Sequence, residues 1–543
     1  MMKHIFRPLL ITLGLGLTLS ACKSLDSELP NPNVPGETQV VPPSLLLPRV
    51  EFDTYEIGTG SGPFSQAQRW NQFSVSNNLY YGGQNQYSWT TNGSMYGVLT
   101  NTIQMETQAA RSLGSRNSAY AALAKFFRAY AFVWEATRVG DTPATQAGQG
   151  LTNLTPVYDT QKAVFARSLT LLDSASTILA GLSNSTATLS AGQTSISGDI
   201  YYNNNLSQWR KAINSFRLRV LISLSKRAGD NADLQIPQQF AAIVNNPTTY
   251  PLLSGNADNL SFVFNSAYNT YPHTPNDGNN QYQNVGATFL GLTTATQDPR
   301  TFIAATPAPA QLTAGKKVSD FTAYVGADIS QSIDNLRLAS NSGAYSFTNN
   351  QRYYGSVVGP EPFIILVYAE QNFNIAEAIN RGWVPGASAS SYYLRGINAS
   401  LSFYGLNEGQ AYPIGDLSGK ALGTATVSIS TFLGNADVVY KGDNAAGLEQ
   451  IINQKYVAFH QNSGYEAFYN WRRTGFPRTF ASTGGGINAS SKIPRRWQYP
   501  VDEQTYNPDN YKGAIQSQFG GTDDLNQDTG LTKKAATRKA ANR

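Results

Sequence analysis

Helices with one apolar face dominate the pattern of the chain. Apolar residues recur at about every 3.6 positions in several stretches, the spacing of a helix that buries one side. The clearest stretch is 117–138, where Ser118 is placed to cap the first turn. Stretches at 160–181, 206–227 and 361–380 predict three more helices. We therefore expect a mainly α-helical protein.

A pair of helices joined by a tight turn is predicted at 449–477. Apolar positions keep helical spacing as far as Phe459, and the run from Asn462 to Gly464 then interrupts the pattern. A second, very aromatic helix follows. It should end at Gly475 and Pro477, because glycine suits the position after a helix and proline cannot continue one.

Two polar loops rich in tyrosine interrupt the helical pattern. Residues 64–114 indicate two helices around a first loop at 77–96, and a predicted strand at 260–264 leads into a second loop that ends at Tyr282. Aromatic faces stack on the apolar faces of a sugar ring, while amides and hydroxyls bind its polar edge. The predicted ligand-binding residues in the two loops are Tyr80, Tyr81, Tyr87, Trp89, Tyr268 and Tyr271. The alternative for each ring is burial in the protein's own core.

The beginning of the chain carries an export signal. Basic residues precede a short apolar run from Leu9 to Leu19, which is too short to span a bilayer as a helix. The following Leu-Ser-Ala-Cys resembles a bacterial lipobox, so residues 1–21 are predicted to be a signal peptide cleaved before a lipid-modified Cys22. Residues 22–43, which are rich in proline, would form the lipidated tether. A plain secretory signal with an incidental cysteine is the alternative.

Charge and composition narrow the class of ligand. Charged residues make up 14% of the chain, against ~25% in ordinary proteins. The net charge of +5 comes from the leader and the tail, because residues 23–530 hold 33 basic and 35 acidic side chains. This balance argues against nucleic-acid binding, and the polar, uncharged, aromatic composition suits neutral ligands.

Residues for catalysis or metal binding are scarce. Outside the leader the only histidines are His273 and His460, fewer than ordinary zinc sites need, and neither has a nucleophile motif nearby. Glu370 and Glu377 share one helix face and are either an acid–base pair or structural carboxylates. Residues 524–528 space three oxygen ligands as in a calcium loop, but the distal glutamate is absent. We predict no catalytic residue, no metal and no cofactor, and calcium binding remains open.

Several segments resemble one family. They are similar to the SusD/RagB outer-membrane lipoproteins of Bacteroidetes, and most similar to the SusD-like branch described as starch-binding and associating with the outer membrane. The segments that carry the resemblance are Asn31-Pro32-Asn33, Pro42–Pro48, Val139–Pro143, Asp298-Pro299-Arg300, Tyr368–Glu370, Ala376–Ala378, Trp471–Pro477, Ile493–Arg496, Tyr499-Pro500 and Gly520–Asp524.

The resemblance implies an architecture and a role. It implies a single SusD-like domain over residues 44–530, with tetratricopeptide-like helical pairs, loop-rich segments and a few short strands, followed by a basic tail at 531–543. It also implies a cell-surface lipoprotein of the outer membrane that captures a nutrient, expected to be an oligosaccharide. Such a protein delivers its cargo to a SusC-type TonB-dependent transporter and is not an enzyme.

Two other functions stay open at this point. RagB-type relatives suggest peptides as the cargo, with the same transporter partner. A glycoside hydrolase would need two carboxylates ~5–9.5 Å apart across a cleft, and no motif nominates such a pair.

Overall fold

The structure is a computed structural model that describes most of the chain after residue 38. The described residues are 39–57, 65–80, 83–90, 93–184, 189–267, 269–271, 278–356, 358–488 and 492–533. The predicted signal peptide, Cys22, most of the predicted tether, Tyr81, Tyr268 and residues 534–543 lie outside the described residues.

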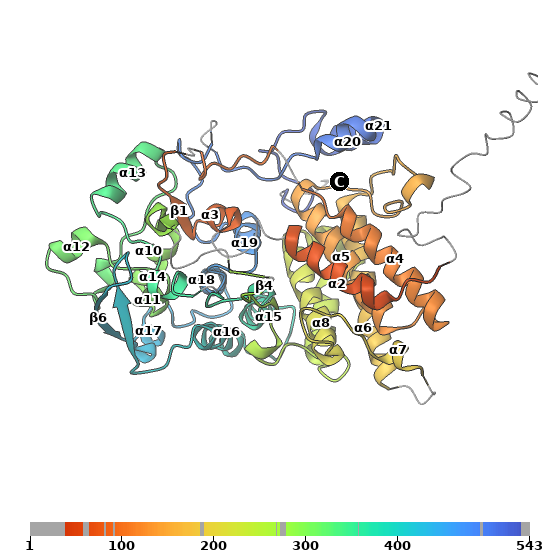
Figure 1. Cartoon of the computed structure of the whole chain (residues 1–543), viewed down its shortest axis with the longest axis horizontal. Helices are drawn as coiled ribbons and strands as arrows, with labels where there is room; N and C mark the ends of the chain where they lie inside the picture. Colours follow the sequence, from red (N-terminus) through yellow and green to blue (C-terminus); the bar gives the residue numbers. More distant parts are fainter. Residues whose placement is uncertain are drawn as a thin grey trace, which may run out of the picture.

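Long helices stack side by side in one half of the molecule, coloured red to yellow in Figure 1. They are α2 (Pro43–Ile57), α4 (Tyr96–Leu113), α5 (Ala119–Val139), α6 (Gln161–Ser183) and α8 (Leu206–Ser223), with the short α7 (Ala191–Thr194) and α9 (Ile236–Asn245) at their edge. Helix α5 packs against α4 and α6, and α6 packs against α8. This half confirms the helices predicted at 117–138, 160–181 and 206–227.

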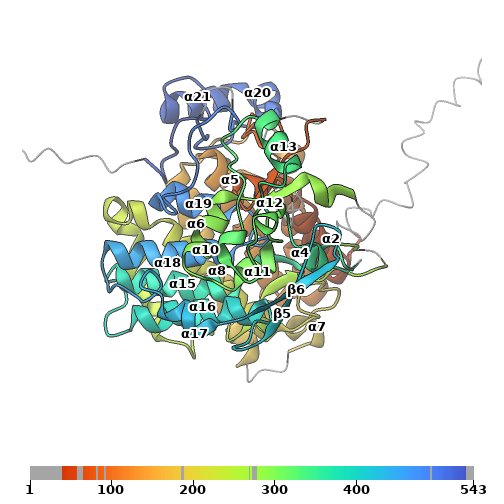
Figure 2. The ribbon, with the colours of Figure 1, turned by 90° about the vertical axis from the view of Figure 1, so that its left-hand side faces the viewer.

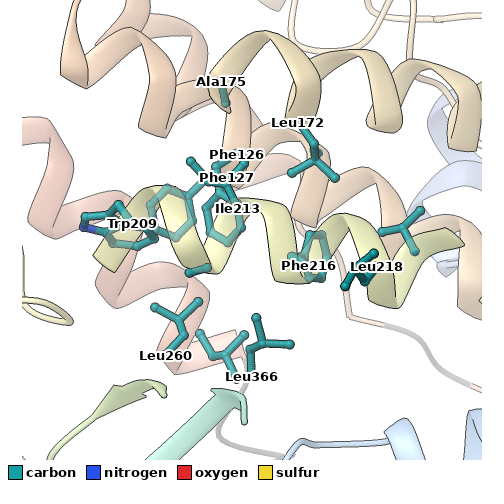
Figure 3. Close-up of a cluster of buried hydrophobic side chains, with 14 of the residues drawn as sticks. Phe126, Phe127, Leu172, Ala175, Trp209, Ile213, Phe216, Leu218, Leu260 and Leu366 are labelled. Atoms are coloured by element: carbon teal, nitrogen blue, oxygen red, sulfur yellow. The ribbon is translucent and has the colours of Figure 1, made fainter. Parts of the chain in front are cut away.

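Aromatic residues on α5 and α8 form the centre of this half (Figure 3). Phe126 lies 5.5 Å from Trp209 and 5.7 Å from Phe216 between ring centroids, and all three rings are buried. Ser118 caps α5 as predicted, because its hydroxyl accepts a hydrogen bond from the Ala121 N–H. Among the described helices, α6 is the one that is long and apolar enough to cross a membrane, but it packs between α5 and α8.

The predicted helix at 361–380 is wrong in its first part. Phe363–Leu366 forms strand β4, which pairs antiparallel with β2 (Leu260–Phe262), and helix α15 begins only at Tyr368 and ends at Asn380. All four residues of β4 are buried, so the strand shows no alternation of apolar and polar residues. A short apolar run of this kind fits a helix or a strand equally well until its partner strand is known. The strand predicted at 260–264 is confirmed in its first three residues.

The second half is built around α15 and the predicted helix pair. Helix α15 packs against α8, α16 (Ala389–Phe403) and α18 (Ala445–Ala458). The tight turn predicted after α18 is confirmed, with Ser463 and Gly464 at positive φ, and leads into α19 (Glu466–Thr474). Gly475 ends α19 in the left-handed conformation, as predicted.

Short elements complete the fold, and Figure 2 labels several of them. They are α3 (Gln66–Trp70), α10 (Ala287–Ala295), α11 (Arg300–Ala304), α12 (Pro309–Thr313), α13 (Ile333–Asn341), α14 (Asn350–Tyr353), α17 (Ile429–Gly434), α20 (Val501–Tyr506), α21 (Pro508–Phe519) and the 3₁₀ turns η3 (Gly150–Thr152), η4 (Ser225–Arg227), η5 (Gly229–Leu234), η6 (Asn256–Asp258), η7 (Gly278–Tyr282) and η8 (Phe321–Ala323). The described strands form three two-stranded antiparallel sheets, β1–β3 (Ser74–Ser76 and Gln283–Val285), β2–β4, and β5–β6 (Ala411–Gly415 and Ala421–Thr426). The fold is mainly α with a few short strands, as predicted.

Candidate ligand-binding site

Three of the predicted ligand-binding rings lie in the core. Trp89 is 0% exposed and stacks on Trp497 with ring centroids 3.8 Å apart. Tyr87 is buried beside it, and its hydroxyl donates a hydrogen bond of 2.7 Å to the carbonyl of Trp70. Tyr271 is buried against Phe264. Burial raises the pKa of both tyrosines. The structure therefore corrects the expectation for these residues, since none of the three rings has a free face for a ligand.

Tyr80, from the same loop as Trp89, has the opposite environment. Its side chain is 86% exposed and stands at the edge of an open hollow of ≈ 650 Å³. The residues that line this hollow are Asn77, Asn78, Leu79, Tyr80, Gln281, Tyr282, Pro309, Arg337, Ser340, Asn341, Ser342, Gly343, Phe347 and Leu417. We call it the Tyr80 hollow.

The β1–β3 sheet brings the two polar loops together at this place. Ser76, at the end of β1, pairs with Gln283, at the start of β3, so the residues that follow β1 lie beside those that precede β3. The backbone N–H of Asn77 donates to the carbonyl of Tyr282 at 3.2 Å, which continues the pairing. The first loop supplies Tyr80 and the second supplies Tyr282, which is 37% exposed.

The Asn77 side chain fastens the floor of the hollow to helix α13. Its amide nitrogen lies 2.7 Å from Ser340 Oγ and 2.7 Å from Asn284 Oδ1, both as a donor. Both views show the segment after β1 running beside α13 (Figures 1 and 2). The β5–β6 connection is held there too, because Asn280 donates to the Leu417 carbonyl at 2.8 Å. A floor fastened by buried hydrogen bonds is set before a ligand arrives.

The chemistry of the hollow suits a ligand with both apolar faces and hydroxyl groups. Tyr80 and Tyr282 offer aromatic surface, and the side chains of Asn78, Gln281 and Asn341 offer amide donors and acceptors. Among the described residues that line it, none carries a carboxylate and one, Arg337, carries a positive charge. Such a lining can bind a sugar, but it lacks the two acids of a glycoside hydrolase.

Glu370 and Glu377, the two glutamates on one face of α15, form buried ion pairs that hold the fold together. Glu370 accepts hydrogen bonds from Arg219 at 2.7 Å (Nε) and 2.5 Å (Nη2). Glu377 binds the guanidinium groups of Arg473 and Arg381. Burial raises the pKa of Glu377, but the two guanidinium groups outweigh it and lower that pKa to about 2. These contacts confirm the structural alternative and leave neither carboxylate for catalysis.

Two other chemical candidates also make structural contacts, while His273 lies outside the described residues. His460 is buried against Phe289, with ring centroids 4.5 Å apart, and burial lowers its pKa to about 3. In the segment that resembles a calcium loop, Asp528 forms an ion pair of 2.8 Å with Arg495.

Sequence reasoning missed the contribution of α13 and of the β5–β6 connection. Asn341, Ser342 and Leu417 line the hollow, yet they lie more than 50 residues from either tyrosine-rich loop. No local motif marks them. They reach the hollow through tertiary contacts, since Asn77 donates to Ser340 on α13 and Asn280 donates to the Leu417 carbonyl.

A mainly helical scaffold with a few short sheets carries this open hollow, which is lined by tyrosine rings and amide side chains. The chain belongs to the SusD-like family described as starch-binding and associating with the outer membrane, whose family model matches residues 35–500. No curated protein matches the chain.

Solved structures agree with this assignment. A SusD homologue from Bacteroides fragilis superposes with a TM-score of 0.76 at 29% identity, covering 91% of this chain and 100% of the other. A second SusD homologue from the same species has a TM-score of 0.73 at 31% identity with the same coverage. An outer membrane protein from Bacteroides vulgatus, whose name connects it with nutrient binding, has a TM-score of 0.72 at 28% identity, again with the same coverage. Family membership supports carbohydrate binding at the outer membrane, and members of this family are binding proteins rather than enzymes.

Proposed function

We propose that the protein captures an oligosaccharide in the Tyr80 hollow at the cell surface and delivers it to a SusC-type TonB-dependent transporter. The observation that carries the proposal is the hollow itself, where two exposed tyrosine rings from distant loops border one space of ≈ 650 Å³ lined by amides and hydroxyls. That volume lies within the range of small-molecule binding sites, ~300–1,000 Å³. A SusD-fold structure at 22% identity carries the name chitin-binding protein, so β-linked glycans belong among the ligands to be tested.

The membrane anchor and the partner belong to the same proposal. Cys22 would carry the acyl chains that hold the protein at the outer membrane, and the lipobox before it supports this role. A tethered binding protein keeps its cargo near the transporter, because the tether raises the effective concentration of one beside the other. In this role the protein binds the cargo and leaves its glycosidic bonds intact.

The ligand test compares a double variant with a matched control. Tyr80→Ala with Tyr282→Ala removes both rings from the hollow, whereas Tyr506→Ala removes a tyrosine that is 71% exposed on α20, outside the residues that line it. Each stacked ring contributes ~0.5–1.5 kcal/mol beyond its buried area, so the double variant should weaken binding roughly 10- to 100-fold. Calorimetry against α-glucan, chitin-derived and uronate oligosaccharides measures the loss.

The comparison distinguishes loss of binding at the Tyr80 hollow from the effect of removing any exposed tyrosine. The control variant should bind as the parent does, and both variants should keep the parental circular dichroism because all three side chains are exposed. Parental affinity in the double variant, for a ligand that the protein binds, would show that the site lies elsewhere.

A further inference from the structure

One cation in the Tyr80 hollow has no partner among the described residues. Arg337 lies on α13 and lines the hollow, and its Nε atom is buried with no hydrogen-bond partner. Neither an ion pair nor a hydrogen bond connects its guanidinium group to any described residue. Arg219, Arg300 and Arg473, three buried arginines of the core, each face a carboxylate instead.

The described surroundings of Arg337 supply no anion. None of the other described residues lining the hollow is acidic. Asp334 lies one helical turn earlier on α13, where it is exposed, and it forms no ion pair with Arg337. A guanidinium group that is partly withdrawn from water loses hydration without gaining a counter-charge. A ligand that brings a negative group into the hollow would supply that counter-charge.

The chemistry of arginine indicates which negative group fits. The guanidinium plane presents parallel N–H donors that match the two oxygens of a carboxylate. The tyrosine rings and amides beside it match the faces and hydroxyl groups of sugar rings. These two requirements meet in an oligosaccharide that contains uronic acid.

We infer that the cargo of the Tyr80 hollow is an acidic oligosaccharide whose uronate carboxylate binds Arg337. This inference rests on the proposed function and names the class of its ligand. It also changes the expectation drawn from composition, which favoured an uncharged ligand, because a single well-placed cation is invisible in a whole-chain average.

The test compares acids with their matched esters. Oligosaccharides of galacturonate, of mannuronate and of glucuronate-substituted xylan are each titrated into the protein by calorimetry, beside the same oligosaccharides with methyl-esterified carboxylates. A charge-assisted bidentate contact corresponds to a preference of roughly 10- to 100-fold, so at least one acid should bind that much more tightly than its ester. The preference should shrink as NaCl is raised, since salt screens the pairing.

Three variants assign the preference to one side chain. Arg337→Gln should bind acid and ester alike, whereas Arg337→Lys should keep part of the preference because it keeps the charge and loses the planar fork. Arg116→Gln removes the same charge from an exposed position outside the hollow and should leave the preference intact. Arg337 forms no hydrogen bond or ion pair with a described residue, so its variants should remain folded.

Each other outcome contradicts the inference. If every ester binds the parent protein as tightly as its acid, the ligand is neutral; the proposed function still stands when the Tyr80 and Tyr282 variant weakens that binding. A sulfated oligosaccharide or an acidic peptide bound more tightly than any uronate assigns Arg337 to another anion. If no oligosaccharide binds at all, the proposed function fails together with this inference.

Discussion

Replacing Trp89 by alanine should lower the free energy of unfolding, and its main effect should be on stability rather than on ligand binding. The ring is 0% exposed and is enclosed by other aromatic rings. Its centroid lies 3.8 Å from that of Trp497, 4.6 Å from that of Phe468 and 5.4 Å from that of Trp70. The backbone carbonyl of Trp89 also accepts a hydrogen bond of 2.9 Å from the Gln498 N–H, which the substitution leaves in place.

The magnitude follows from the contacts that disappear. Removing a buried tryptophan ring costs ~3–5 kcal/mol in transfer free energy and cavity formation. No side-chain hydrogen bond adds to this cost, because the Trp89 Nε1 atom has no hydrogen-bond partner among the described residues. Trp89→Phe keeps one ring and also removes that unpartnered N–H, so it should cost less, about 1–2 kcal/mol.

Urea unfolding followed by circular dichroism measures the difference. The urea concentration at the midpoint of unfolding should fall from the parent to Trp89→Phe and again to Trp89→Ala. The free energy of unfolding of Tyr80→Ala should stay within ~0.5 kcal/mol of the parent value, because the Tyr80 ring is exposed. A Trp89→Ala protein with parental stability and lost oligosaccharide binding would refute the reasoning and return Trp89 to the ligand site.

Two further predictions concern the buried charges and the anchor. The folded pKa of Glu377 is about 2 and its ordinary value is 4.5, so its ion pairs should contribute about 3 kcal/mol to stability above pH 4.5 and lose that contribution as the pH falls toward 2. The stability difference between the parent and Glu377→Gln, measured by urea unfolding across this range, should therefore shrink as the pH falls. A difference independent of pH would contradict the assignment. When expressing cells are fractionated, Cys22→Ser should move the protein from the outer-membrane fraction to the soluble fraction. Mass spectrometry should find the acyl mass on the N-terminal peptide of the parent and not on that of the variant. Retention of the variant in the membrane would argue against the lipid anchor.

The helical part of the fold could be predicted because helices are local. The cap at Ser118, the turn at Ser463 and the stop at Gly475 are each decided by residues a few positions apart, and all three are confirmed. Phe363–Leu366 could not be assigned in this way, since its strand exists through pairing with Leu260–Phe262, a hundred residues earlier.

The candidate site was only partly predictable for the same reason. Tyr80 and Trp89 lie nine residues apart in one polar, aromatic loop, yet the first is exposed and the second is covered by Trp497. Composition identifies such a loop without deciding which of its rings turn inward. The hollow also needs α13, which is joined to the loop by the hydrogen bond from Asn77 to Ser340 and which carries Arg337.

The measurement that tests the central claim most directly is a crystal structure of the protein with the oligosaccharide that it binds most tightly. The account predicts sugar density in the Tyr80 hollow, with one sugar ring against Tyr80 or Tyr282 and polar contacts to Asn78, Gln281 or Asn341. Sugar density in any other part of the molecule, with this hollow empty, would contradict it.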